Sequence, residues 1–146
     1  MVITGVADQI PERISSIVYL DAFVPENGQS LMDLASEGAG GEHIRANADS
    51  MVPFPPALAK AFGVPESELW KYTAQSRTEI DPVKLTGAYR HIPKKTFVLA
   101  EKWPGFHGFY QKVSADPAWR TATMPTSHMV MRDDPALCAQ LLQEAI

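Results

Sequence analysis

The sequence predicts an α/β fold of about three parallel strands with flanking helices. Three short runs have the length and the apolar, β-branched composition of strands, at residues 16–20, 95–100 and 119–124. Segments with helical spacing separate these runs, and each connection is longer than a hairpin turn. Strands joined by helical connections of this length run parallel, with right-handed crossovers.

The first element is a predicted helix over residues 1–12. Its apolar side chains recur at the spacing of one helix face, which we expect to be buried, and they are Val2, Ile3, Val6, Ala7 and Ile10. The run at 16–20 is continuously apolar except for its first residue, which predicts a strand buried on both faces. This strand ends at a carboxylate, Asp21.

The middle of the chain has weaker patterns. A short helix is predicted near residues 31–35, and the glycines at 38–41 interrupt it. Prolines are frequent from residue 53 onward, which favours loops, and another short helix is predicted at 65–70. The apolar side chains of this part are suited to a cap over a pocket, and they include Met51, Phe54, Leu58 and Phe62. They suit an ordinary hydrophobic lid with no ligand nearly as well, and the resemblance described below is what implies a cap insertion at 38–90 between the two parts of a core, 1–37 and 91–146.

The last third of the chain has the clearest pattern. After the strand at 95–100, a helix is predicted at 106–115, followed by the strand at 119–124. A closing helix is predicted from about 134 to 145, because Asp133-Asp134-Pro135 is typical of a helix start. Cys138 falls within the apolar pattern of this helix, so we interpret it as a core residue.

Composition excludes several classes of function. The chain has 146 residues, of which 45% are hydrophobic and 21% charged, and its formal net charge is −4. This charge favours neither nucleic acid nor an anionic membrane as a partner. A single cysteine cannot form an internal disulfide, and the N-terminus lacks the basic region of a signal peptide, so we expect a cytoplasmic protein. The four histidines are scattered without zinc-ligand spacing, and we expect no metal and no cofactor.

Three side chains are candidates for acid–base chemistry. Glu101 and His128 each follow the end of a predicted strand, where open α/β sheets bind ligands. A histidine base oriented by a carboxylate is the arrangement found in catalytic triads. Asp21 also follows a strand and competes with Glu101 as the acid. We expect Glu101 to be the nearer one, because its strand directly precedes the strand before His128 along the chain.

Two stretches resemble the α/β-hydrolase superfamily. Residues 127–130 followed by Asp134-Pro135 resemble its histidine loop, and residues 1–25, with PERI and YLDAFVP, resemble the region after its nucleophile. The nearest branch contains plant hydroxynitrile lyases, methyl-salicylate esterases and related bacterial esterases. The resemblance covers nearly the whole chain and implies the C-terminal half of an α/β-hydrolase fold, with a cap insertion.

The resemblance implies an esterase that acts on small or medium apolar esters without a cofactor. His128 would be the general base and then the general acid, and Glu101 or Asp21 would orient it. However, the sequence contains no Gly-x-Ser-x-Gly nucleophile motif, and the nearest string is Gly28-Gln29-Ser30. In the family this motif ends just before the residues that match Met1, so we expect a truncated chain. One alternative is a non-enzymatic chain, either an inert fragment or a small-molecule binding module. A second alternative is an enzyme with hydroxynitrile lyase-like activity.

The missing half of the fold leads to an expectation about assembly. Without it, the strand at 16–20 would have an uncovered edge, and Val2, Ile3 and Val6 would be partly exposed. Uncovered strand edges pair with another chain or aggregate. We therefore expect an oligomer, favouring a two-fold homodimer that forms through residues 1–20.

Overall fold

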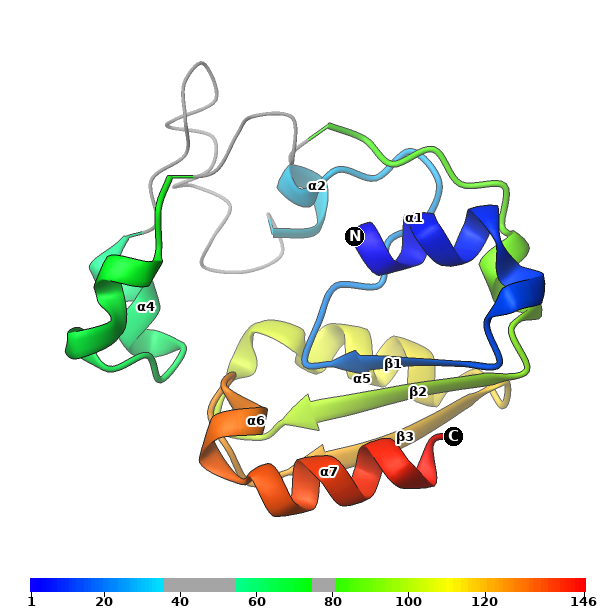
Figure 1. The fold of residues 1–146 in the computed structure, drawn as a ribbon. Coiled ribbons are helices and arrows are strands. Elements are labelled where there is room, and N and C mark those ends of the chain that lie inside the picture. The colour runs from blue at the N-terminus through cyan, green and yellow to red at the C-terminus, as the bar shows by residue number, and fades with distance from the viewer. Residues whose placement is uncertain (36–54, 75–80) are drawn as a thin grey trace.

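Three parallel strands form the centre of the protein, in the order β1-β2-β3 (Figure 1). The computed structural model describes residues 1–35, 55–74 and 81–146. The strands are β1 (Ser16–Leu20), β2 (Lys94–Ala100) and β3 (Trp119–Met124). Leu20 pairs with Val98 at one end of the first ladder, and Ala100 pairs with Met124 at the end of the second. The predicted α/β class with three parallel strands is therefore confirmed.

β2 is the central strand, and six of its seven residues are buried. Burial on both faces explains its nearly continuous apolar sequence. β1 is buried at alternate positions only, because Ile17 and Tyr19 face one layer while Val18 and Leu20 are half-buried on the other. The expectation that β1 is buried on both faces is therefore met on one face and only partly on the other.

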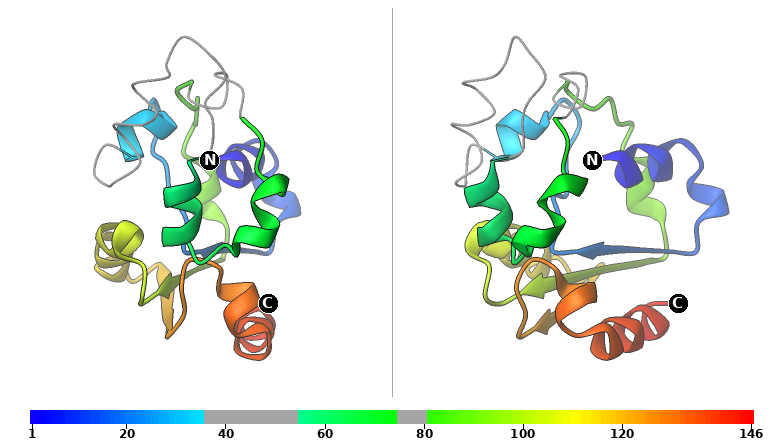
Figure 2. Two further views of the ribbon diagram at one scale, coloured as in Figure 1. Left: turned by 90° about the vertical axis from the view of Figure 1, so that its left-hand side faces the viewer. Right: turned by 60° about the vertical axis from the view of Figure 1, so that its left-hand side comes forward.

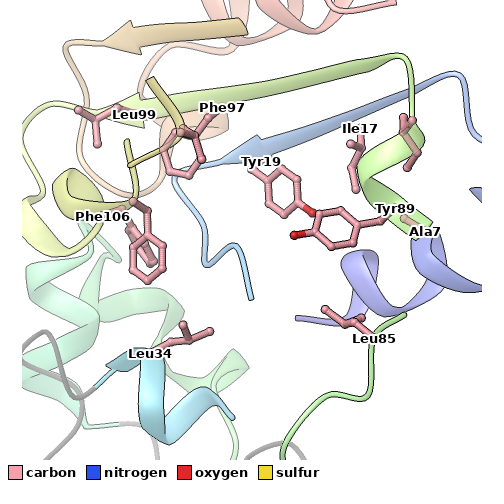
Figure 3. Packing of buried hydrophobic residues seen from close by; sticks show 12 residues of the cluster. Ala7, Ile17, Tyr19, Leu34, Leu85, Tyr89, Phe97, Leu99 and Phe106 are labelled. Atoms are coloured by element: carbon pink, nitrogen blue, oxygen red, sulfur yellow. The ribbon is translucent and has the colours of Figure 1, made fainter. Parts of the chain in front are cut away.

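Helices cover the two faces of the sheet with separate apolar clusters. One cluster joins Tyr19 and Phe97 of the sheet to α1 (Val2–Gln9), η4 (Ala88–His91) and α5 (His107–Ser114). The other joins Val98 and Met124 to α6 (Val130–Asp133) and α7 (Pro135–Glu144). Figure 2 shows α5 and α7 on opposite sides of the strands, and Figure 3 shows the first cluster from close by.

Short helices occupy the connections. They are η1 (Pro11–Arg13), α2 (Leu31–Ala35), α4 (Pro56–Ala61), η2 (Glu66–Lys71) and η5 (Pro104–Phe106). The segment that contains α4 and η2 approaches α6, where Glu68 pairs with Arg132 at 2.9 Å. The glycines at 38–41, together with Met51 and Phe54, lie outside the described residues. The division into a core and a cap at 38–90 therefore stays a prediction.

α1 packs on the sheet through a face that its apolar pattern does not indicate. The expected buried face is wrong, because Val2 is 80% exposed and Ile3, Val6 and Ile10 are also exposed. Of the expected residues Ala7 alone is buried, and Thr4 and Asp8 are buried with it, where each of these two polar side chains has a hydrogen-bonding partner. The later expectation that Val2, Ile3 and Val6 are exposed is confirmed.

Asp8 fastens α1 to the chain segment before β2. Its carboxylate accepts hydrogen bonds from the backbone N–H groups of Thr86 (2.5 Å) and Tyr89 (3.1 Å), and from the Thr86 hydroxyl at 3.0 Å. Burial raises the pKa of the Asp8 carboxyl, but these hydrogen bonds outweigh it and the pKa is lowered overall. Hydrogen bonds of a buried carboxylate, and not only apolar contacts, therefore hold α1 in place.

α7 begins where Asp134 accepts a hydrogen bond from the Leu137 N–H, at 2.9 Å. Cys138 is buried against the second face of the sheet, which confirms its core role. Burial, with a smaller contribution from Asp134, raises the pKa of its thiol. In the part of the chain that is described, no helix has the length and apolar content needed to cross a membrane.

Candidate active site

Asp21 follows β1 directly, and its backbone turns sharply there. Its N–H still continues the ladder by donating to the Val98 carbonyl at 2.7 Å, but its φ of 45° lies in the left-handed region. Among the described residues, Asp21 alone adopts a positive φ without being glycine. Aspartate is one of the residue types that tolerate this conformation, at a cost of roughly 1 kcal/mol or more. The turn directs the carboxylate back over the end of β2, where Oδ1 accepts the Ala100 N–H at 3.0 Å.

His128 lies in the loop between β3 and α6. This loop folds over the end of β2, because the Lys102 N–H donates to the Thr126 carbonyl at 3.0 Å. Asp133 closes the loop by accepting the Ser127 N–H at 2.7 Å, and its pKa is lowered mainly by its hydrogen bond with the Ser127 side chain. The histidine is thereby carried across the central strand toward β1.

The imidazole of His128 pairs with Asp21. Nδ1 of the ring lies 2.7 Å from Oδ2 of the carboxylate, and the Asp21 side chain is fully buried while that of His128 is 24% exposed. When Nδ1–H donates to the carboxylate, Nε2 is left as the ring's acceptor. A buried carboxylate that fixes the ring in this way prepares Nε2 to accept a proton from a nucleophile.

The expectation that Glu101 lies nearer to His128 than Asp21 does is wrong. Glu101 is exposed in the turn after β2, and its N–H donates to the Met124 carbonyl on the β3 side at 2.9 Å. Within the described residues, its carboxylate makes no hydrogen bond or ion pair with His128. Neighbouring strand ends bring backbones together, but the left-handed turn at Asp21 decides which carboxylate faces the ring.

An apolar cavity of about 350 Å³ opens beside this pair. Both Asp21 and His128 line it, as do Met1 at the start of α1 and two side chains of the expected cap, Leu58 and Phe62. Its volume and its mixture of apolar walls with a few polar groups are typical of small-molecule sites.

Three aromatic rings surround the imidazole. The Phe106 ring is stacked on it, with centroids 5.3 Å apart and planes at 20°. Phe62 lies at 4.5 Å and Trp103 at 6.4 Å, both tilted. The sequence indicated Phe62 as a side chain suited to cover a pocket, but it gave no sign of Trp103, and Phe106 is read there only as the beginning of a predicted helix. Their role depends on how the loops fold.

No described serine hydroxyl is hydrogen-bonded to His128. Ser30 is buried at the start of α2, where its hydroxyl donates to Asp33 at 2.7 Å, and it does not line the cavity. Ser127 accepts the Met129 N–H at 3.3 Å and lies against Gly63. Both hydroxyls have structural partners, so neither is placed as a nucleophile.

The chain is similar to known proteins in both sequence and fold. No protein-family model matches the chain. The chain is 33% identical over 160 residues to a carbendazim hydrolyzing esterase of Nocardioides sp. (strain SG-4G), covering 97% of this chain and 65% of that protein. Its sequence thus spans a little under two thirds of this relative's length.

A solved structure has the same arrangement of elements. It is an extracellular α/β-hydrolase from a Paenibacillus species, described as sharing structural and functional homology with Tobacco Salicylic Acid Binding Protein 2. The TM-score is 0.73 at 23% identity, with 99% of this chain and 66% of that chain covered. The three parallel strands of this chain, with their helices, therefore match part of the α/β-hydrolase fold.

Proposed function

We propose that this chain provides the acid–base part of an ester-hydrolysing site, with His128 as the base and Asp21 as its orienting acid. The observation that supports this most is the 2.7 Å contact between Asp21 Oδ2 and His128 Nδ1 at the wall of an apolar cavity. Similarity to an esterase supports the same class of reaction. Glu101 has no part in the proposal, because its carboxylate faces solvent.

The proposed steps follow from the tautomer of the ring. Nε2 accepts a proton from the attacking hydroxyl group or water, while the oxygen of that group adds to the ester carbonyl carbon. The imidazolium that forms is stabilised by the buried Asp21 carboxylate. Nε2 then gives the proton to the departing alkoxide, so that an alcohol leaves. When the attacking group is water, the other product is the carboxylic acid.

The nature of the nucleophile sets the expected rate. Since no described serine hydroxyl is hydrogen-bonded to His128, the nucleophile of the described site would be water. In triad enzymes, loss of the nucleophile costs about 10⁶-fold in rate. We therefore expect weak turnover of activated short-chain esters, and full activity would need a nucleophile from outside this sequence or from an unconventional position within it.

The cavity indicates the class of ester. Its walls are apolar side chains and the rings of Phe62, Trp103 and Phe106, and a volume of about 350 Å³ limits the size of the substrate. Flat or small apolar groups can pack against such rings. The proposed substrates are small or medium apolar esters.

A binding module without catalysis is the second candidate, and a specific observation favours it. The cavity is formed, yet the hydroxyls of Ser30 and Ser127 are engaged elsewhere. Such a protein would hold an apolar ester or its product without turning it over.

We also propose a two-fold homodimer that forms through residues 1–20. Val2, Ile3 and Val6 are exposed beside β1, which is an edge of the described sheet. Asp8 is the one charged side chain of α1, and it is buried against Thr86, so no charged side chain of the helix keeps this surface in water. Beside it, the exposed Glu12 and Arg13 have opposite charges, which a two-fold axis can bring face to face between copies.

The test of catalysis is p-nitrophenyl acetate turnover by the wild type and by His128→Ala. The hydrolysis proposal predicts that His128→Ala falls to the rate of a catalyst-free control. Equal rates for the two proteins would remove His128 from the mechanism. A wild type at the rate of the control that still binds an unreactive ester analogue would favour the binding module.

A further inference from the structure

A second cavity lies at the opposite end of the sheet from the Asp21–His128 pair. Its volume is about 320 Å³, and it is formed by η4, α5 and the first residues of β2 and β3. Its walls include the side chains of Tyr89, Phe109 and Trp119. A cavity of this size can hold a small organic ligand.

This cavity is separate from the candidate active site. The two cavities share no lining residue, and a cluster of phenylalanine rings lies between them. Phe23 of the active-site cavity contacts Phe109 of the second cavity, with ring centroids 5.5 Å apart. Phe106 packs against Phe23 at 4.8 Å and against Phe109 at 6.1 Å, and it also stacks on His128. Packed aromatic side chains therefore separate a ligand in one cavity from the other cavity.

Lys95 is the unusual residue of the second cavity. Its side chain lines the cavity although the residue is only 6% exposed. Its ammonium donates to the carbonyls of Arg90 and Ile92, both at 2.9 Å, and within the described residues it has no carboxylate partner. Lysine is almost never fully buried unless it is paired, and an ammonium has three N–H donors. The two carbonyls leave one N–H donor of the ammonium without a described acceptor. They also leave its positive charge without a negatively charged partner among the described residues.

The other charges of the cavity leave a small positive excess. Glu26 is paired with Lys112 at 2.6 Å, so these two charges cancel. Arg90 lies over the Tyr89 ring, and Asp116 is the one other acid on the wall. With Lys95 included, the lining side chains have a net charge of about one positive unit, taking acids and bases as ionised at neutral pH.

We propose that this cavity binds a small monocarboxylate with a flat apolar body. The carboxylate accepts a hydrogen bond from the Lys95 ammonium and neutralises the positive excess. The apolar body packs between the rings of Tyr89, Phe109 and Trp119. This inference goes beyond the proposed hydrolysis and does not depend on it, because it concerns another cavity and no bond is made or broken.

The three tryptophans of the chain allow a direct test. Trp119 lines the second cavity, Trp103 lines the active-site cavity, and Trp70 is exposed on η2. Each indole N–H gives one signal in the ¹H–¹⁵N spectrum of labelled protein. The probe is benzoate, and benzamide is its neutral control of the same shape.

Benzoate is expected to shift the Trp119 signal to saturation, with a dissociation constant on the order of 1 mM for so small a ligand. Benzamide should leave Trp119 nearly unmoved. The proposal is overturned if benzoate shifts only Trp103, if benzamide shifts Trp119 equally, or if Trp119 does not respond well above that concentration.

Variants identify the groups responsible. Lys95→Met should weaken benzoate binding by more than about tenfold, because it removes a buried charged donor. Arg90→Gln should weaken it roughly two- to fivefold, because its charge is exposed. Lys102→Gln, which removes an exposed positive charge in the turn after β2, at the other end of that strand from Lys95, should have no effect. If Lys95→Met does not fold, the test rests on Arg90→Gln. An Arg90→Gln variant that binds benzoate as tightly as the wild type would then contradict the proposal.

Discussion

Nδ1 of His128 lies 2.7 Å from Oδ2 of Asp21, although 107 residues separate them in the sequence. Two local structures make this contact. The left-handed backbone of Asp21 turns the carboxylate over β2, and the loop closed by Asp133 brings the ring across to meet it. Both residues are therefore positioned by their loops rather than by the strands that precede them.

The loop contact between Gly63 and Ser127 can be tested with a matched pair of substitutions. A Cβ at Gly63 would lie 2.3 Å from Ser127 Oγ, whereas Gly28 has a similar φ and nothing within 4 Å. Gly28→Ala should cost about 1–2 kcal/mol for its left-handed backbone alone. Gly63→Ala should cost more and also reduce esterase turnover, because Ser127 adjoins His128. Urea denaturation and turnover of both variants measure this, and equal losses of stability would contradict the contact.

Asp8 should make stability depend on pH. Because its folded pKa is lowered, its contribution is present above the pKa of the unfolded chain, about 3.9, and is lost as the pH falls through the folded value. Asp8→Asn should reduce the free energy of unfolding by roughly 1–3 kcal/mol at pH 7.

The difference between Asp8→Asn and the wild type should shrink as the pH falls from about 4 through the lowered folded pKa of Asp8, below which both side chains are neutral. Asp81→Asn is the control, because Asp81 is an exposed residue of the same type. A difference between Asp8→Asn and the wild type that stays constant with pH would show that the carboxylate charge is not what matters.

Assembly through residues 1–20 predicts a mass of about twice 16.0 kDa at micromolar concentration. Val6→Glu should shift the protein toward the monomer, because it places a charge on the exposed apolar face of α1. Leu142→Glu, at an exposed apolar position on α7, should not. Light scattering gives the mass directly. A clean monomer with cooperative unfolding in the wild type would refute the dimer.

The sequence was informative where one physical effect dominates. The predicted strands at 16–20 and 119–124 agree with β1 and β3, and 95–100 differs from β2 by one residue. Continuous apolar runs marked β1 and the end of β2, because buried parallel strands need them, whereas β3 is mostly only half-buried and has a weaker pattern. The predicted closing helix agrees with α7 to within a residue at each end, since Asp134 and Pro135 form a strong start signal.

It was less informative where tertiary contacts compete with a pattern. The apolar spacing of α1 indicated the wrong face, because hydrogen bonds of Thr4 and Asp8 fix how the helix docks. The order of strands suggested Glu101 as the nearer acid, whereas a single positive φ at Asp21 decided the pairing. Such a backbone angle cannot be read from an aspartate in a sequence.

The most direct test of the acid–base assignment compares p-nitrophenyl acetate turnover by Asp21→Asn and Glu101→Gln under the same conditions. The two substitutions remove the same charge, one from the carboxylate bonded to His128 and one from the carboxylate in solvent. We predict that Asp21→Asn falls to the rate of His128→Ala, as loss of the orienting acid costs about 10⁴-fold in a full triad, and that Glu101→Gln keeps the wild-type rate. Loss of activity in Glu101→Gln with retention in Asp21→Asn would contradict the account.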